Sequence, residues 1–512
     1  MKQNRRLRTV AIATGAGLAV SIGLPVGITL PAHADNGTDT SALRAAVSAE
    51  NIVHHLEALQ AIADANDGNR AAGTSGHIAS AEYIENQLRA AGYTPRRQAF
   101  SYDQFVENSS ALQQISPTAT TYVDQTDYDT MEYSGSGNVT AAVTPVDINL
   151  TGDRASTSGC EATDFAGFIA GSIALVQRGT CAFRTKVDNA ANAGAVGVIV
   201  FNQGNEIPGD DRVGLLFGTL AAPQAAIPAM GSTFALGENL ASTPGATIRM
   251  QVDAGVQTIN TFNVLADSSG RADRTVVVGA HLDSVAEGPG INDNGSGSAA
   301  ILETAIQMAK SGDKPTNRVR FAFWSGEEDG LVGSDYYVSQ LTKRDIKNHA
   351  LNLNFDMVAS PNAVRFVYDG DGDAFGTAGP KGSANIERIF TDYFASQGLA
   401  TEPTAFDGRS DYSGFIDNGI PAGGLFTGAE GIKTAEQAEI YGGVAGEPFD
   451  PCYHQACDTS DNLDLAVLEQ MADGIAHTTQ TFAETTSSIN GTSKGGGAMA
   501  AHSQMKGNYA QN

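Results

Sequence analysis

Thr275-Val-Val-Val-Gly-Ala-His-Leu-Asp-Ser, residues 275–284, is an apolar run that ends in two polar side chains, His281 and Asp283. A short apolar run with such a boundary is typical of a strand buried on both faces. Two further, mainly apolar runs also end in acidic side chains: residues 321–326 before Glu327 and Glu328, and residues 353–355 before Asp356. Each of these polar groups is therefore expected at the end of a strand.

From about residue 258 onward, strand-like runs alternate with segments of helical periodicity. The predicted strands are 275–278, 319–323, 351–355 and 363–368, and the predicted helices are 298–310, 334–341 and 384–397. This alternation predicts an α/β fold with a mostly parallel, doubly wound sheet covered by helices on both faces. The carboxyl ends of the strands line the ligand crevice in such a sheet, so we expect His281, Glu327 and Asp356 to converge.

The remaining segments differ from this α/β region. Residues 41–93 have apolar positions at helical spacing on either side of a polar turn, which predicts two helices. The middle of the chain has short alternating runs with Gly and Thr, which predict a β-rich inserted domain, and the end is rich in Ser, Thr and Gly. The predicted bounds are 35–132 and 258–484 for the α/β domain, 133–257 for the insert and 485–512 for a flexible tail.

The first 34 residues have the form of an export signal. Four basic residues precede an uncharged stretch that ends in Ala32-His33-Ala34, the pattern of a cleavage site. A membrane anchor is the alternative, but glycines and a proline dilute the hydrophobicity of the stretch. We therefore expect a secreted, extracellular protein whose mature chain starts near Asp35 and does not cross a membrane.

Charge and cysteine content narrow the possible partners. The chain is 17% charged with a formal net charge of -26, which argues against nucleic acid and anionic membranes as partners. Four cysteines in an exported chain predict two disulfide bonds. Proximity in the sequence pairs Cys160 with Cys181 and Cys452 with Cys457, and no signature of a catalytic cysteine accompanies them.

Histidine and carboxylate side chains without thiolates are the ligand set of a catalytic zinc site rather than of a structural one. A single Asp in a loop is more often a cap or a solvated residue. Several such residues that each follow an apolar strand are a much rarer coincidence, and loops add Asp293 and His454 to the set. The set is large enough for two metal ions that share one carboxylate.

The motifs that contain these residues resemble those of the M28 zinc aminopeptidases, with the secreted actinobacterial leucine-preferring type as the nearest in appearance. The motifs are residues 279–284, 290–297, 324–334, 354–357 and 452–458. The insert resembles a protease-associated (PA) domain through residues 159–165, 173–183 and 186–202. An insert of this kind resembles the vacuolar-type aminopeptidases (aminopeptidase Y), whereas the shortest secreted relatives lack it.

This resemblance implies a secreted aminopeptidase with two zinc ions per chain. One ion would take His281 and Asp356, the other Glu328 and His454, with Asp293 bridging them. Glu327 would be the general base and acid, and Tyr453 would donate to the oxyanion. Asp283 would orient His281 rather than bind metal, and the substrate would contact Arg409 and Phe426.

The expected substrates are peptides with a free amino terminus and a hydrophobic first residue, cleaved by a monomeric enzyme. A carboxypeptidase or a glutaminyl cyclase of the same fold is the alternative among enzymes. A carboxypeptidase would need additional Arg or Lys to hold a carboxylate, and a cyclase generally needs a single zinc ion. A binding protein that has lost catalysis is the alternative from another class, but it would have lost some of the ligands.

Overall fold

The computed structural model of the chain describes residues 37–207, 210–312 and 314–490. The predicted export signal at 1–34 lies outside the described residues, as does most of the predicted tail at 485–512. The described start of that tail contains α13 (Ser487–Asn490), where Ile489 is buried and the Asn490 amide donates to the carbonyl of Ala350. The packed part of the chain therefore ends later than predicted. Within the described ranges, no helix combines the length and the apolar character needed to cross a membrane.

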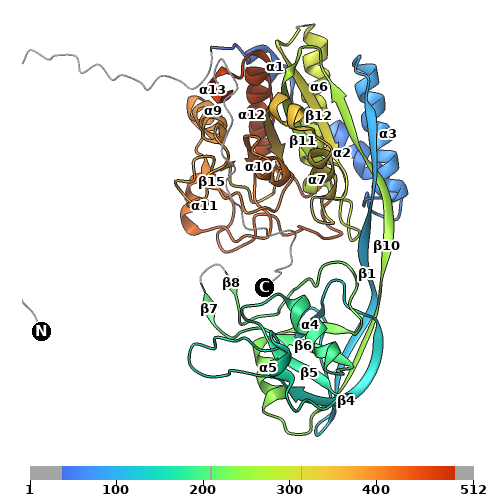
Figure 1. Cartoon of the computed structure of the whole chain (residues 1–512). Helices are drawn as coiled ribbons and strands as arrows, with labels where there is room; N and C mark the ends of the chain where they lie inside the picture. The colour runs from blue at the N-terminus through green and yellow to red at the C-terminus, as the bar shows by residue number, and fades with distance from the viewer. Residues whose placement is uncertain (1–36, 208–209, 313, 491–512) are drawn as a thin grey trace, which may run out of the picture. The chain divides into compact units, whose positions relative to one another are not determined.

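The α/β domain is built on a sheet in the order β15-β14-β16-β13-β11-β12-β10, with β1 paired to β10 (Figure 1). Most neighbouring pairs in its centre are parallel, which confirms the predicted fold class. β14 against β16, β10 against β12 and β1 against β10 are antiparallel. The bounds are β1 (Arg96–Ser116), β10 (Thr247–Asp267), β11 (Arg271–His281), β12 (Asn317–Trp324), β13 (His349–Phe355), β14 (Phe366–Tyr368), β15 (Glu402–Thr404) and β16 (Ala422–Phe426).

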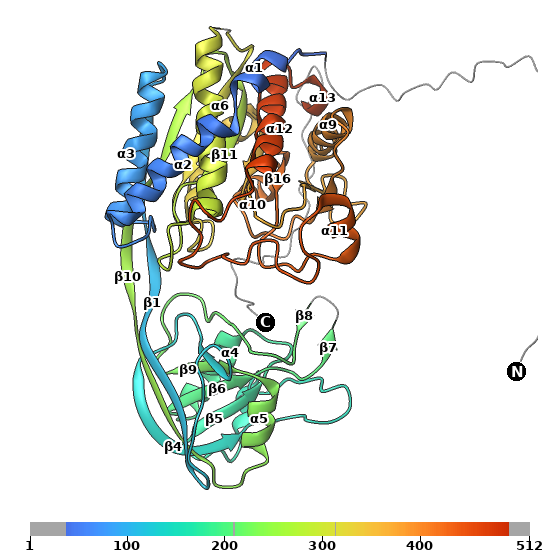
Figure 2. The same cartoon turned by 180° about the vertical axis from the view of Figure 1, so that it is seen from behind.

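Helices cover both faces of this sheet because successive strand residues point to opposite sides. Val276 and Val278 belong to the larger hydrophobic core, whereas Val277 between them belongs to a second core on the other face. Figure 2 shows the helices over the first face, including α2, α3, α6 and α12. The bounds are α2 (Ala49–Asp64), α3 (Ser75–Ala90), α6 (Gly297–Ser311), α9 (Ser383–Ser396) and α12 (Leu465–Glu484) on that face, and α7 (Val332–Ser339) and α10 (Ser413–Asp417) on the other.

Two predictions for this domain differ from the structure. Residues 41–93 form three helices rather than two, because the extended backbone of Val47 ends α1 (Ser41–Ala46) and Ser48 starts α2 by accepting from the backbone N–H of Asn51 as its N-cap. The strand predicted at 363–368 begins only at Phe366, as β14. The other elements are η2 (Ile291–Ser296), α8 (Lys343–Asn348) and α11 (Ala435–Tyr441).

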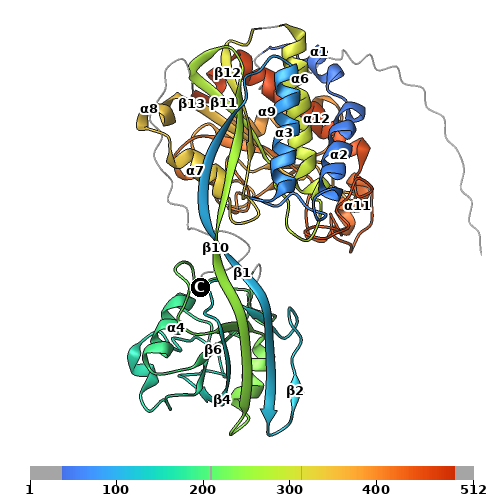
Figure 3. The same ribbon diagram turned by 90° about the vertical axis from the view of Figure 1, so that its right-hand side faces the viewer.

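The strands β1 and β10 form a long antiparallel ribbon (Figure 3). Each is 21 residues long. β10 pairs with β12 at residues 264–267 and with β4 (Gly137–Pro145) at residues 247–252. Among the described residues, β1 is the only strand that pairs with the section of β10 between these two pairings. We call residues 99–107 and 254–262 the two-stranded section of the ribbon.

The inserted domain has its own sheet, in which β4, β5 (Ile173–Gln177), β6 (Gly197–Phe201) and β9 (Ala229–Ser232) are parallel neighbours. The helices α4 (Phe183–Asn192) and α5 (Phe234–Ala241) pack on opposite faces of it. The strand β3 (Tyr128–Thr130) pairs with β9, so this sheet begins before the boundary predicted at 133. The short elements are β2 (Thr120–Thr121), η1 (Ala162–Phe165), β7 (Glu206–Ile207) and β8 (Asp210–Asp211).

Candidate metal centre

The acidic and imidazole side chains of the predicted site meet at one edge of the central sheet. His281 is the last residue of β11, and the parallel register places it beside Trp324, the last residue of β12. Asp356 directly follows β13, and the two glutamates lie in the loop after β12. Parallel neighbouring strands therefore deliver all of these groups to the same edge, as the sequence predicts.

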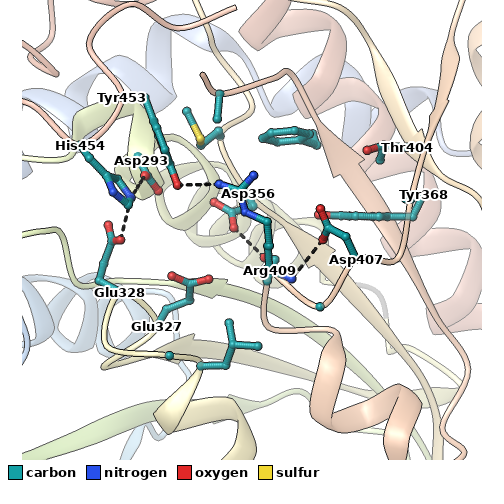
Figure 4. A pocket seen from close by; sticks show the side chains of 18 residues that line it. Asp293, Glu327, Glu328, Asp356, Tyr368, Thr404, Asp407, Arg409, Tyr453 and His454 are labelled. Atoms are coloured by element: carbon teal, nitrogen blue, oxygen red, sulfur yellow. Dashed lines mark hydrogen bonds and ion pairs between the residues drawn. The ribbon is translucent and has the colours of Figure 1, made fainter. Parts of the chain in front are cut away.

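The carboxylate of Asp293 lies close to both histidines of the site, and Figure 4 shows it beside His454. Its Oδ1 is 3.3 Å from Nε2 of His281, and its Oδ2 is 3.3 Å from Nε2 of His454. The Oε2 atom of Glu328 is 3.0 Å from the same His454 nitrogen, and Oδ1 of Asp356 is 3.3 Å from Nε2 of His281. Two imidazole–carboxylate groups thus share one carboxylate.

Glu327 lies beside this arrangement. Its Oε2 is 3.9 Å from Nε2 of His281, which is longer than the contacts of Asp293 and Asp356 with the same nitrogen. Glu327 and Glu328 are neighbours in the chain, but they face different histidines. Their separate positions allow one to bind a metal ion and the other to move a proton.

A carboxylate from the far end of the chain fixes the backbone of Asp293. The two oxygens of Asp458 accept from the backbone N–H groups of Asn292 and Asp293 at 2.8 and 2.9 Å. The amide of Asn292 donates in turn to Asp450 at 2.7 Å. No role was predicted for Asp458 from the sequence, although it is the last residue of the motif at 452–458.

Asp283 contacts His281 and the backbone of both glutamates. Its backbone carbonyl lies 3.1 Å from Nδ1 of His281, whereas its carboxylate accepts from the backbone N–H groups of Glu327 and Glu328 at 3.4 Å. Its carboxylate is 3.8 Å from Nδ1 of His281. The closest contact with His281 thus comes from the carbonyl, and the carboxylate holds the glutamate loop.

The pKa values of the glutamates and of His454 are raised, because the site buries several carboxyl groups close together. Burial and the nearby charge of Asp293 raise the pKa of Glu328 to about 8, and burial raises the pKa of Glu327 well above its ordinary value. Burial disfavours the charged form of His454, but Asp293 and Glu328 outweigh it and raise its pKa to about 10. Four carboxyl groups around two imidazoles favour binding of cations.

Two buried carboxylate oxygens of the site indicate that metal ions fit there. Oε1 of Glu328 and Oδ1 of Asp356 are buried and have no hydrogen-bond partner in the described part of the chain. The other oxygen of Asp356 accepts from the hydroxyl of Ser410 at 2.6 Å, so Ser410 holds the carboxylate with Oδ1 facing Nε2 of His281. Buried polar atoms without partners are costly, and divalent cations would satisfy them. Imidazole and carboxylate ligands without thiolates suit catalytic zinc.

Comparisons with known proteins agree with this geometry. The model of peptidase family M28 matches residues 263–479, and that of the PA domain matches residues 139–240. An aminopeptidase of Pseudomonas aeruginosa is 48% identical over 436 residues, covering 85% of this chain and 80% of that protein. The chain belongs to peptidase family M28. This confirms the predicted family and the predicted PA insert.

Two further relatives are similar to this M28 peptidase over most of their lengths. A probable lipoprotein aminopeptidase of Mycobacterium tuberculosis, LpqL, is 42% identical over 458 residues, which are 88% of each chain. The solved structure of an aminopeptidase from Aneurinibacillus sp. strain AM-1 has a TM-score of 0.66 and 27% identity. It covers 86% of this chain and 95% of its own.

The pocket of this M28 peptidase opens beside the carboxylate and imidazole groups named above (Figure 4), and its wall includes Met357, Tyr368 and Phe426. Arg409 donates to the hydroxyl of Tyr453 at 3.3 Å and to Glu430 at 2.8 Å. Burial, followed by the charges of Asp293 and Glu328, raises the pKa of Tyr453, so its phenol stays protonated. Both predicted disulfide bonds are present, and Cys452–Cys457 closes the turn that contains Tyr453 and His454.

Proposed function

We propose that the chain is an aminopeptidase that holds two zinc ions and hydrolyses the first peptide bond of peptides with a free amino terminus. The observation that carries this proposal is the position of Asp293, whose two oxygens each lie 3.3 Å from a different histidine. His281 and Asp356 would hold one ion, and Glu328 and His454 the other. The relatives named as aminopeptidases support the same reaction.

The residues around the proposed ions have separate tasks in hydrolysis. Zinc, when bound, supplies a Lewis acid for the scissile carbonyl and lowers the pKa of water. Glu327 takes a proton from the attacking water and delivers it to the leaving amine, a task suited to a carboxyl group whose pKa burial raises. Tyr453 keeps its proton and donates a hydrogen bond to the oxygen on which negative charge develops.

The pocket favours an amino terminus over a carboxyl terminus. Glu327 and Asp356 line it and offer negative charge to an ammonium group. Arg409 is the cation that a carboxypeptidase would use, but it pairs with Glu430 and faces Tyr453. Met357 and Phe426 give the wall an apolar part, which suits a hydrophobic first residue.

We also propose that the protein acts outside the cytoplasm. Two disulfide bonds support this location, because such bonds persist in oxidising compartments. The name of the mycobacterial relative describes a lipoprotein, which agrees with export of that protein.

The test is a panel of substrates on the purified, zinc-loaded protein. We expect release of anilide from leucine anilide, none from the same compound with a blocked amine, and removal of residues from the front of a peptide. Cleavage from the carboxyl end would support a carboxypeptidase instead. Cyclisation of an amino-terminal glutamine without hydrolysis would support a cyclase, and no turnover of any substrate would support a binding protein.

A further inference from the structure

Side chains of β10 form hydrogen bonds with both ends of the loop that contains Glu327 and Glu328. The hydroxyls of Thr261 and Ser325 are 2.6 Å apart. The side chain of Asn263 accepts from the backbone N–H of Ser325 at 3.1 Å and donates to the carbonyl of Gly333 at 2.8 Å. These contacts fix the two ends of the loop at 325 and 333. They leave its middle, at 326–330, to be held by other groups.

Asp329 connects the middle of this loop to β1. Its carboxylate accepts from the hydroxyl of Tyr102 and from the side-chain amide of Gln104, with one oxygen for each donor. The Tyr102 ring also packs on Gly326, which has a φ of +74°, and a Cβ there would lie 3.2 Å from the Tyr102 hydroxyl. The ring and the two donors thus lie against the loop that follows β12.

Two carboxylates therefore restrain the loop on either side of Glu327. Asp283, two residues after the end of β11, accepts from the backbone N–H of Glu327, and Asp329, two residues beyond Glu327 in the loop, is bound by β1. The carbonyl of Glu327 accepts from the N–H groups of Gly330 and Leu331 at 2.8 Å, so the turn that follows is closed on Glu327 itself. A displacement of Asp329 would be transmitted directly to the backbone of Glu327.

Tyr102 and Gln104 belong to the two-stranded section of the ribbon, whose strands continue into the sheet of the inserted domain. We propose that Asp329 is a positioning residue for the Glu327 carboxylate and that Tyr102 and Gln104 act through it. The ribbon that leads to the insert is then also a support of the general base. This inference rests on the proposed function, because it assigns Glu327 the proton transfer. Small misplacements of such a group are expected to reduce turnover more than binding.

The test compares three variants of the full-length zinc-loaded protein, and a fourth variant serves as a rescue. Tyr102→Phe removes one donor but keeps the ring on Gly326, Asp329→Ala removes the acceptor, and the double variant removes both. With leucine anilide we expect kcat to fall about tenfold in each, with KM within about twofold of the parent and both zinc ions retained. The double variant should be no worse than Asp329→Ala, because Tyr102 acts through Asp329. Asp329→Glu, which keeps an acceptor, should recover part of the loss.

Asp103→Asn is the matched control, because Asp103 lies on the same strand and bonds to Thr258 rather than to the loop. Its kcat should equal that of the parent. Unchanged kcat in both Tyr102→Phe and Asp329→Ala would overturn the proposal, as would additive losses in the double variant. A rise in KM alone or a loss of zinc would also overturn it.

Amide hydrogen exchange provides a readout that does not depend on activity. In Tyr102→Phe, the N–H groups of Gly330, Leu331 and Val332 should exchange faster, whereas those of 276–280 within β11 should not change. Equal exchange in the parent and the variant would overturn the positioning role. A parent protein that exchanges as expected but cleaves no substrate would instead reject the proposed aminopeptidase function.

Discussion

Nε2 of His281 and Nε2 of His454 each lie 3.3 Å from a different oxygen of one carboxylate, that of Asp293. His281 comes from the end of a strand, whereas His454 comes from a disulfide-closed turn near the end of the chain. Asp293 itself is held by Asp458 through two backbone N–H groups. The segment 452–458, which supplies His454, thus also fixes the backbone of the shared carboxylate.

Asp293→Ala is expected to lose both zinc ions, because the carboxylate would serve each of them. His454→Ala is the contrasting variant. It should lose chiefly the ion that Glu328 shares, so about one ion should remain. Metal analysis of the two purified proteins checks this. If Asp293→Ala retained two zinc ions and full activity, Asp293 would not be the bridge.

The two neighbouring glutamates should give opposite results when each is replaced by glutamine. Glu327→Gln should keep its zinc but lower kcat by about 10²–10⁴-fold, the usual loss of general acid–base help. Glu328→Gln should lose zinc, because its Oε2 is the atom 3.0 Å from His454. Metal content and leucine anilide kinetics of both variants test this. Exchanged phenotypes would mean that the two roles are reversed.

The convergence of the site could be predicted because it depends on a regular element. His281, Glu327 and Asp356 each follow an apolar run, and parallel strands bring such ends together at one edge. Knowledge of the order of the strands was not required. Apolar runs followed by polar side chains were therefore sufficient to place these residues near one another.

Two of the groups that orient the site, Asp458 and Ser410, could not be predicted, because they act from loops that are distant in the sequence. Asp458 reaches the backbone of Asp293, and Ser410 reaches Asp356, and an isolated Asp or Ser in a loop carries no sign of such a contact. The strand β1 was missed for another reason. Most of its side chains are exposed or half-buried on both faces, so they lack the alternation that marks a strand with one buried face.

The Asp267–Arg320 pair should make the stability of the α/β domain depend on pH. Burial opposes the charge of Asp267, but two hydrogen bonds of 2.6 Å from Arg320 outweigh it and hold the pKa of Asp267 below its ordinary value. The folded state therefore binds this proton more weakly than the unfolded state. The contribution of the pair is present above the unfolded pKa of about 3.9 and is lost as the pH falls through the lower folded value.

Asp267→Asn should lower the free energy of unfolding at pH 7 by about 3 kcal/mol, the lower end for a broken buried pair, because 31% of the Asp267 side chain is exposed. The difference from the parent should shrink below about pH 4. Trp324 is the single tryptophan and lies in the same sheet, so its fluorescence reports this domain. Asp273→Asn breaks the exposed pair with Arg271 and should change little. If the difference in free energy of unfolding between Asp267→Asn and the parent were the same at all pH values, the lowered pKa of Asp267 would be contradicted.

Removal of the inserted domain should leave the metal site and the cleavage of small substrates intact. None of the proposed ligands lies in the insert, and the register of the ribbon pairs Glu107 with Ala254. Replacing residues 108–253 by Asn-Gly would close the two strands with a tight turn and would keep Tyr102 and Gln104. We expect this shortened protein to bind two zinc ions and to cleave leucine anilide with a kcat close to that of the full chain. The prediction does not extend to long peptides, for which the rates of the shortened protein and the full chain can differ.

A deeper deletion is the matched control for this prediction. Phe100 pairs with Thr261, so replacing residues 101–260 by Asn-Gly removes Tyr102 and Gln104 while leaving Thr261 and Asn263 on the loop. It should also bind two zinc ions, but its kcat should fall about tenfold with little change in KM, as in Tyr102→Phe. If the first deletion protein is folded, binds two zinc ions and cannot cleave leucine anilide, the insert must supply a group that the reaction needs. The proposed separation between a catalytic α/β domain and a non-catalytic insert would then be wrong.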